Sequence, residues 1–199
     1  MERVAGLDAA YLEKGVGIGA AVVLRWPTLE LLEERWAVGR VSFPYIPGLL
    51  SFREVPLLLK AFGELKRRVE VIFVDGQGIA HPRGLGLASH IGIILDLPTI
   101  GCAKKPLVGE GRSPGYEKGA SSPLLYRGRR VGVILRTKRG VKPIYVSPGH
   151  RIDIKASQQL VISACTRYRL PEPTRKAHLL AQRAKRELSS RSRAEAPPP

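Results

Sequence analysis

Cysteine is scarce in this 199-residue sequence, which holds only Cys102 and Cys165. Two cysteines argue against a disulfide framework and against a cysteine-rich zinc cluster, and we expect both to be small buried residues. Long hydrophobic runs are also lacking, since no stretch approaches the roughly 18 consecutive apolar residues of a membrane helix. The opening residues, MERVAGLD, lack the apolar core of a signal peptide. These absences predict a soluble, cytoplasmic protein with no membrane contact.

Acidic residues are few in the second half of the chain. Residues 1–100 hold 11 Lys+Arg and 11 Asp+Glu, whereas residues 101–199 hold 22 and 6, so the whole formal net charge of +16 lies in the second half. Lysine and arginine release counterions when they contact phosphates, and this asymmetry therefore suggests a polyanionic partner. A basic surface can also serve solubility alone, and net charge does not separate these two interpretations.

The composition, with 44% apolar and 25% charged residues, is that of one globular domain. We place this single domain at residues 1–189. Residues 190–199, SRSRAEAPPP, are basic and end in three prolines, and we expect them to form a disordered tail.

The stretch at residues 69–83, VEVIFVDGQGIAHPR, organises the rest of the chain. Its residues 71–74 are apolar on both faces and rich in β-branched side chains, which predicts a buried central strand. Asp75 follows directly, and Gly76 and Gly78 let the backbone turn sharply and approach a ligand. A carboxylate at the end of a strand, next to glycines that expose the backbone, suggests that an active site lies at this end of the strand. An aspartate in this position can also simply begin an Asx-turn.

The remaining hydrophobic patterns predict an α/β fold. A strand, an apolar helix at 84–97 and a second strand at 99–103 follow one another, which is the pattern of a parallel crossover. Further strands are predicted at 4–12, 17–26, 36–41, 130–137 and 143–147, further helices from residue 51 and at 155–168 and 174–188, and a loop at 108–123.

For four other polar side chains, the local sequence does not decide between a functional role and a purely structural one. Glu54 falls near the start of the helix from residue 51, where the helix dipole favours an acid without any catalytic role. Lys104 follows the strand at 99–103 and would share the edge of Asp75, yet a solvated lysine is the simpler alternative. His81 lies in the loop beyond the central strand, and His178 borders the apolar stripe of the last helix, where spacing does not distinguish it from a surface residue.

Residues 44–48, PYIPG, form a stiff segment, because two prolines fix their own φ angles and restrict the residues before them. Tyr45 should therefore be presented rigidly at its tip. A core tyrosine in a proline-rich loop is the alternative on local sequence alone.

Seven segments together resemble the endonuclease V family, the deoxyinosine-directed repair nucleases with a ribonuclease H-like fold. They are VAGLDAAY at 4–11, FPYIPGLLSFRE at 43–54, VDGQGIAHPRGLGLASHIG at 74–92, PTIGCAKKPL at 98–107, VILRT at 133–137, KPIYVSPGH at 142–150 and RLPEPTRKAH at 169–178. The resemblance covers residues 4 to about 186. It implies a ribonuclease H-like α/β fold, with a mixed central sheet flanked by helices.

The resemblance also implies an active site. Asp8 and Asp75 are then the metal-binding carboxylates, and Glu54 and His178 complete the site. Mg²⁺ suits such a site because it prefers carboxylates, waters and phosphate oxygens, and Mn²⁺ is expected to substitute. His178 would orient or deprotonate the attacking water, and Lys104 would lie near the scissile phosphate.

Substrate contacts follow from the same resemblance. The segment 44–48 would act as a wedge, with Tyr45 filling the gap that an extruded base leaves, and Pro44, Ile46 and Pro47 shaping the loop. The flipped hypoxanthine would lie among backbone groups near Gly48, Leu50 and Gly76. His81 matches a histidine of the family's motif.

These implications predict a monomeric endonuclease that acts on inosine-containing DNA. It would hydrolyse the second phosphodiester bond 3′ to deoxyinosine, leaving 3′-hydroxyl and 5′-phosphate ends. An inosine-specific ribonuclease of the same family is one alternative. A non-catalytic nucleic-acid-binding protein is another, which the basic second half would explain equally well, but such a protein has no need for acids opposed to phosphate.

Overall fold

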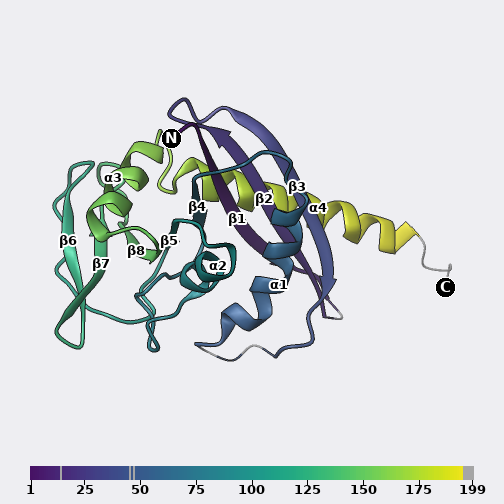
Figure 1. Cartoon of the computed structure of the whole chain (residues 1–199), viewed down its shortest axis with the longest axis horizontal. Helices are drawn as coiled ribbons and strands as arrows, with labels where there is room; N and C mark the ends of the chain where they lie inside the picture. Colours follow the sequence, from purple (N-terminus) through teal and green to yellow (C-terminus); the bar gives the residue numbers. More distant parts are fainter. Residues whose placement is uncertain (14, 45, 47, 195–199) are drawn as a thin grey trace.

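A computed structural model describes residues 1–13, 15–44, 46 and 48–194. In these residues a mixed eight-stranded sheet with the order β3-β2-β1-β4-β5-β8-β7-β6 is flanked by helices, as Figure 1 shows. Its strands are β1 (Arg3–Tyr11), β2 (Val16–Arg25), β3 (Leu31–Arg40), β4 (Val71–Val74), β5 (Thr99–Ala103), β6 (Ser121–Tyr126), β7 (Arg129–Leu135) and β8 (Ile144–His150). Its helices are α1 (Leu50–Gly63), α2 (Leu87–Leu95), α3 (Ile154–Ala164) and α4 (Glu172–Ala194). The predicted α/β fold with a mixed central sheet is confirmed.

Parallel pairing in the middle of the sheet positions the polar side chains. β1 pairs with β4 and β4 pairs with β5, both in parallel, so the predicted crossover through α2 is confirmed. β8 is antiparallel to β5 and to β7, which makes β7 run in the direction of β5. The strands β1, β4, β5 and β7 therefore all end at one edge of the sheet, which we call the C-terminal edge.

Alternating side chains divide the core between the two faces of the sheet. Ile72 and Val74 of β4 pack with Leu58 of α1 and Ile91 of α2. Phe73 packs on the opposite face, in a cluster that includes residues of α3. On that same face, Ala177, Leu180 and Ala181 of α4 pack against Ala10, Ala20 and Val22 of the first hairpin. The helices thus cover both faces and leave the C-terminal edge free for polar groups.

Several element boundaries differ from the sequence-based expectation. β6 lies partly within the stretch predicted to be a loop, and as an edge strand it accepts Pro123 without losing ladder hydrogen bonds on both sides. β3 begins at Leu31, earlier than predicted, because an edge strand tolerates its charged residues. α2 begins only at Leu87, since the preceding loop folds back and Gly86 N–H donates to the carbonyl of Gly78 at 3.0 Å.

The last helix is longer than predicted. α4 begins at Glu172 and continues to Ala194, so residues 190–194, which we expected in the disordered tail, are helical. In the turns just before these residues, Arg183 and Glu187 form an i,i+4 ion pair and the Ser189 hydroxyl donates to the carbonyl of Lys185. Both cysteines are buried and free, as predicted. In the described residues, no helix is both long enough and apolar enough to cross a membrane.

Candidate active site

Asp8 and Asp75 lie side by side at the C-terminal edge. Leu7 is opposite Val74 in the parallel β1·β4 pair, so the next residue on each chain is one of the two aspartates. Period-two alternation places both side chains on the sheet face that α4 covers. The side chain of Asp8 is 11% exposed and that of Asp75 is 15% exposed. Asp8, within β1, and Asp75, directly after β4, thus project from neighbouring strands onto the same face of the sheet.

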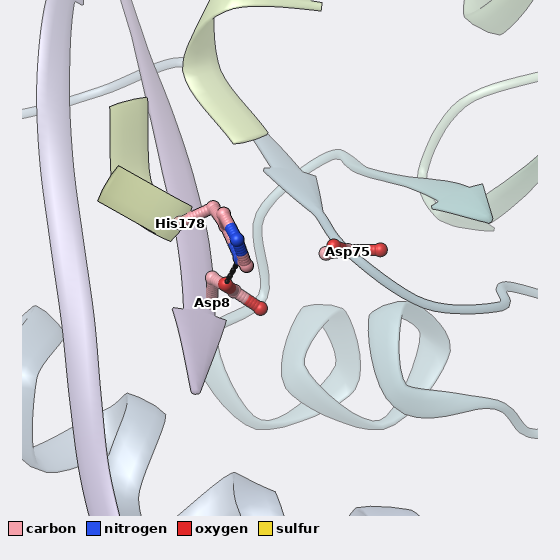
Figure 2. A group of neighbouring side chains, drawn as sticks. All are labelled: Asp8, Asp75 and His178. Atoms are coloured by element: carbon pink, nitrogen blue, oxygen red, sulfur yellow. Dashed lines mark hydrogen bonds and ion pairs between the residues drawn. The ribbon is translucent and has the colours of Figure 1, made fainter. Parts of the chain in front are cut away.

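His178 reaches Asp8 because α4 lies directly on β1. A Cβ at Gly6 would collide with the carbonyl oxygen of Pro173, so only glycine allows the start of α4 to approach the strand so closely. Nδ1 of His178 lies 2.7 Å from Oδ2 of Asp8, as the dashed line in Figure 2 marks. Spacing in the sequence could not identify this contact, which joins residues 170 positions apart.

The three side chains of Figure 2 form a compact ligand set. One ligand atom from each of Asp8, Asp75 and His178 lies within 4.8 Å of the other two. Lys104 completes one side, since its Nζ lies 2.7 Å from Oδ2 of Asp75. Arg169 holds the backbone beside this lysine by donating to the Lys104 carbonyl at 3.0 Å. The predicted placement of Lys104 at the Asp75 edge is correct, and the lysine is not simply solvated.

Glu54 approaches the cluster from α1. The helix starts at Leu50 and has no acidic residue in its first turn, so the helix dipole does not explain the position of Glu54. Its Oε1 accepts a 3.0 Å hydrogen bond from the hydroxyl of Tyr11, the last residue of β1. The guanidinium of Arg53 lies 4.4 Å from the centre of the Tyr11 ring. Sequence reasoning missed Tyr11 and Arg53 as site residues, and the only available signal was that Tyr11 ends the strand of Asp8.

The protonation equilibria of these acids reflect burial and mutual repulsion. Burial, together with the charges of Asp8 and Asp75, raises the pKa of Glu54 to about 7. Burial is also the main reason that the pKa of Asp8 is raised, and the charge of Asp75 adds to it. The hydrogen bond with Asp8 raises the pKa of His178.

A divalent cation fits this donor set. Three acids that repel one another, two of them within a few ångströms, are stabilised in their charged forms by a cation between them. Carboxylate oxygens with one imidazole are ligands that Mg²⁺ or Mn²⁺ accepts, and no cysteine lies in the cluster. The residues present therefore fit the predicted metal.

A cavity of about 250 Å³ opens beside the carboxylates. It gathers four residues that the sequence assigned to substrate binding, namely Gly48, Leu50, Gly76 and His81. The other lining residues, which were not assigned to substrate binding, are Ser51, Gln77, Leu87, Lys105, Pro106 and Leu107. The cavity is mostly apolar with a few polar groups, which is the usual character of a pocket for a planar organic ring.

The predicted wedge is described only in part. Tyr45 and Pro47 lie outside the described residues, whereas Pro44 and Ile46 are exposed. Nη1 of Arg83 donates to the carbonyl of Gly48 at 3.1 Å, and Nη1 of Arg53 donates to the carbonyl of Phe43 at 3.1 Å. The two arginines thus fix both ends of the segment that carries the predicted wedge.

Comparisons with known proteins find relatives that cover most of the chain. Residues 1–179 match the family model described as Endonuclease V. The chain is 52% identical over 182 residues to an endonuclease V of Azotobacter vinelandii, covering 90% of this chain and 82% of that one. The structure matches that of an endonuclease V from Streptomyces avermitilis with a TM-score of 0.90 and 47% identity, covering 94% and 82% of the two chains. This likeness confirms the predicted ribonuclease H-like fold.

A more distant relative adds a bound nucleic acid. An endonuclease V from Ciona intestinalis is 25% identical, with a TM-score of 0.83 and coverage of 94% of this chain and 86% of that one. It was crystallised with a 23mer DNA that contains an inosine followed by a ribo-adenosine.

Proposed function

The chain belongs to the endonuclease V family, and we propose that it is a metal-dependent endonuclease that recognises deoxyinosine in DNA. In this proposal it hydrolyses the second phosphodiester bond 3′ to the lesion and leaves 3′-hydroxyl and 5′-phosphate ends. The observation that carries the proposal is the convergence of Asp8, Asp75 and His178 beside the cavity formed by Gly48, Gly76 and their neighbours. We further propose that the protein acts as a monomer, since one chain supplies every residue of this site. We also propose that it is cytoplasmic.

Asp8 and Asp75 would hold Mg²⁺, or Mn²⁺ in its place. The bound metal would supply Lewis acidity for the scissile phosphate and a lowered pKa for water. The two carboxylates keep the site anionic, and their fixed strand positions set where the phosphate can approach.

In the proposed reaction, His178 accepts a proton from the attacking water. Its Nδ1 faces the carboxylate of Asp8, so in the neutral ring the proton is favoured on Nδ1 and Nε2 is left as the acceptor. This is the tautomer that a general base needs, with the carboxylate stabilising the imidazolium that forms. The imidazole side chain is 40% exposed, which leaves room for water to reach Nε2.

Lys104 and Glu54 surround the reacting phosphate in different ways. The ammonium of Lys104 contacts Asp75 and is 43% exposed, so it can also neutralise charge on an incoming phosphate oxygen. Glu54 brings a third carboxylate, whose high pKa in the metal-free protein shows that ionising it there is costly. A bound cation would favour its ionised form and make it a further anchor for water or metal.

The cavity would receive the extruded base. Hypoxanthine differs from adenine in presenting a carbonyl and an N1–H, so fixed backbone donors and acceptors can separate the two. An inosine-specific ribonuclease remains the second candidate, because the DNA bound to the Ciona relative carries a ribonucleotide directly after the inosine.

A matched substrate set tests the proposal. Oligonucleotides with deoxyinosine, deoxyadenosine or deoxyguanosine at one position are incubated with Mg²⁺, and the same sequences are prepared as RNA. We expect one incision, after the nucleotide 3′ to deoxyinosine, and a product that a ligase can rejoin. Release of free hypoxanthine without strand cleavage would instead indicate a glycosylase, and cleavage of RNA alone would indicate the ribonuclease.

A further inference from the structure

A second aromatic and basic surface lies on the C-terminal edge, at a distance from the carboxylates. The loop after β5 and the loop after β7 both lie at this edge, because β5 and β7 run in the same direction. Three strand spacings separate β4 from β7 in the order β4-β5-β8-β7. At about 4.8 Å per spacing, the end of β7 is roughly 14 Å along the edge from Asp75.

Tyr116 is an exposed aromatic ring in a fixed position. The residue is 63% exposed, yet its carbonyl accepts a 3.1 Å hydrogen bond from the N–H of Gly140 in the loop after β7. A Cβ at Gly140, whose φ is +68°, would lie 2.6 Å from the Tyr116 hydroxyl, so the ring lies directly on that loop. Arg136 holds the preceding turn by donating to the carbonyls of Gly115 and Pro114 at 2.9 Å each. The ring is thus held in place while most of its surface stays accessible to a ligand.

Positive charge accompanies the ring. The guanidinium of Arg139 lies 5.5 Å from the centre of the Tyr116 ring and pairs with Glu117. Lys138 and Lys142 are exposed, and neither takes part in an ion pair within the described part of the chain. Arg169 connects this surface to the active site, because the same nitrogen donates to the carbonyls of Lys104 and Pro143.

We propose that Tyr116 and Arg139 form a stacking platform for one unpaired nucleobase of the cleaved strand, away from the lesion pocket. The inference rests on the proposed function, which brings the strand to the C-terminal edge. Exposed aromatic rings beside cations bind single strands in this way, since every base offers a flat face. For a strand that stays stacked, with a rise of about 3.4 Å per nucleotide, a separation of about 14 Å corresponds to roughly four nucleotide steps. A paired base is already stacked on both sides, so the platform favours a single-stranded or frayed flank.

The chain contains a matched control for this platform. Tyr126, at the end of β6, also carries a guanidinium over its ring, that of Arg127 at 5.1 Å. The turn that it borders joins β6 to β7 at the edge of the sheet opposite the C-terminal edge. Tyr126 therefore offers similar chemistry at the edge of the sheet that faces away from the carboxylates.

Binding to single strands of different length tests the proposal. Labelled deoxyinosine oligonucleotides carry either two or eight nucleotides on each side of the lesion, and Ca²⁺ replaces Mg²⁺ to suppress cleavage. We expect Tyr116→Ala to raise Kd about tenfold for the long strand and less than twofold for the short one. Tyr116→Trp should retain tight binding, and Tyr126→Ala should bind both strands as wild type does.

Abasic sites moved along the DNA strand test the platform in a way that a misfolded protein variant cannot imitate. In the long strand, single abasic sites are introduced one at a time, and Kd is measured for wild type and Tyr116→Ala. One abasic position should weaken wild-type binding and remove the difference between the two proteins. Equal losses for Tyr116→Ala on short and long strands, or no such abasic position, would overturn the platform.

Cleavage of the long deoxyinosine strand by wild type in Mg²⁺ separates the two proposals. If that strand is not cleaved, the proposed function fails, whatever the binding results are. If it is cleaved while Tyr116→Ala binds the long strand as tightly as wild type does, the platform alone is rejected.

Discussion

The hydroxyl of Tyr11 donates a 3.0 Å hydrogen bond to Oε1 of Glu54, across the boundary between the end of β1 and the side of α1. Arg53, next to Glu54 on the helix, covers the ring of Tyr11 and also holds the carbonyl of Phe43. The carboxylate of the active site is therefore connected, through two side chains, to the start of the predicted wedge segment. We propose that Tyr11 positions Glu54.

We expect Tyr11→Phe to lower the rate of Mg²⁺-dependent cleavage about threefold and to leave the melting temperature nearly unchanged. A hydrogen bond of this kind contributes roughly 0.5–1.5 kcal/mol, and water can replace part of it. Tyr11→Leu also removes the ring beneath Arg53 and should lower the rate further. Single-turnover rates at saturating enzyme check this, and identical rates for Tyr11→Phe and wild type at every Mg²⁺ concentration would refute a positioning role.

Glu54 should make the metal-free protein less stable as the pH rises. The pKa of Glu54 is raised to about 7, so between its ordinary value and pH 7 the folded state keeps a proton that the unfolded state has released. Stability then falls with rising pH through that window, and the loss is complete above the folded pKa. The shift corresponds to roughly 3 kcal/mol at most, and partial solvent contact reduces the expected effect to about 2 kcal/mol.

Urea unfolding in a chelator at pH 5 and pH 8 measures this effect for wild type and Glu54→Gln. The variant should lose less stability than wild type between the two pH values, by about 2 kcal/mol. Added Mg²⁺ should shrink the difference, because a cation favours the ionised carboxylate. If wild type and Glu54→Gln lose the same amount of stability between pH 5 and pH 8, the raised pKa of Glu54 is contradicted.

Asp75→Asn should lower the rate of Mg²⁺-dependent cleavage at least about a hundredfold, while the protein stays folded. The substitution removes charge from the metal site and no core volume, and in a chelator it relieves the repulsion with Asp8. We therefore expect an equal or higher melting temperature without metal and a smaller increase when Mg²⁺ is added. Asp8→Ala and Glu54→Ala should also lose activity.

Asp96→Asn is the matched control, because Asp96 pairs with His150 and Arg151 at the far end of α2. It should cleave at the wild-type rate. Wild-type cleavage by Asp75→Asn, with unchanged metal dependence, would show that the site is wrongly assigned.

The sequence predicted the carboxylate pair but not the contacts that complete it. The apolar run before Asp75 and the crossover through α2 predict that Asp75 and Lys104 share one edge. The place of Asp8 depends on the parallel pairing of β1 with β4, which only the family resemblance implied. The position of His178 depends on how α4 crosses β1 at Gly6, a tertiary contact that helical periodicity does not encode. Tyr11 and Tyr116 escaped notice for the same reason, since their partners, Glu54 and Arg139, belong to distant segments.

The errors in the predicted bounds of strands also arise from contacts between distant segments. β3 and β6 are the two outermost strands of the sheet. Such strands carry charged residues and proline, which local sequence patterns assign to loops. Their strand structure comes from pairing with β2 and β7. The central strands were predicted well because burial on both faces leaves an unmistakable apolar run.

The salt dependence of binding should decrease when lysines beyond the active site are removed. For Lys138→Gln together with Lys142→Gln, we expect the log–log slope of affinity against salt to fall by about 1.4 on a single strand, as each contact contributes about 0.7. The charge-matched control is Arg129→Gln together with Lys155→Gln, which alters exposed residues at the opposite edge. Equal slopes for the two double variants would mean that binding responds to net charge alone.

Tyr45→Ala should reduce cleavage more on duplex than on single-stranded deoxyinosine substrates. Extruding a base from a duplex costs a few kcal/mol of stacking and pairing, and an inserted aromatic ring offsets part of this cost. In a single strand little stacking must be broken, so the ring matters less. Because base–aromatic stacking contributes roughly 1–3 kcal/mol, the defect on duplex should be about tenfold to a hundredfold in the step that extrudes the base.

The competing interpretation is that Tyr45 is a core residue. Its removal would then lower the melting temperature and depress cleavage of both substrates together. Arg83, which donates to the carbonyl of Gly48 at the end of the segment, gives an independent variant, since Arg83→Gln loosens the segment without touching the tyrosine. If the wedge is correct, Arg83→Gln shows the same preference for single strands in a milder form. Equal defects on duplex and single strand, with a lowered melting temperature for Tyr45→Ala, would reject it.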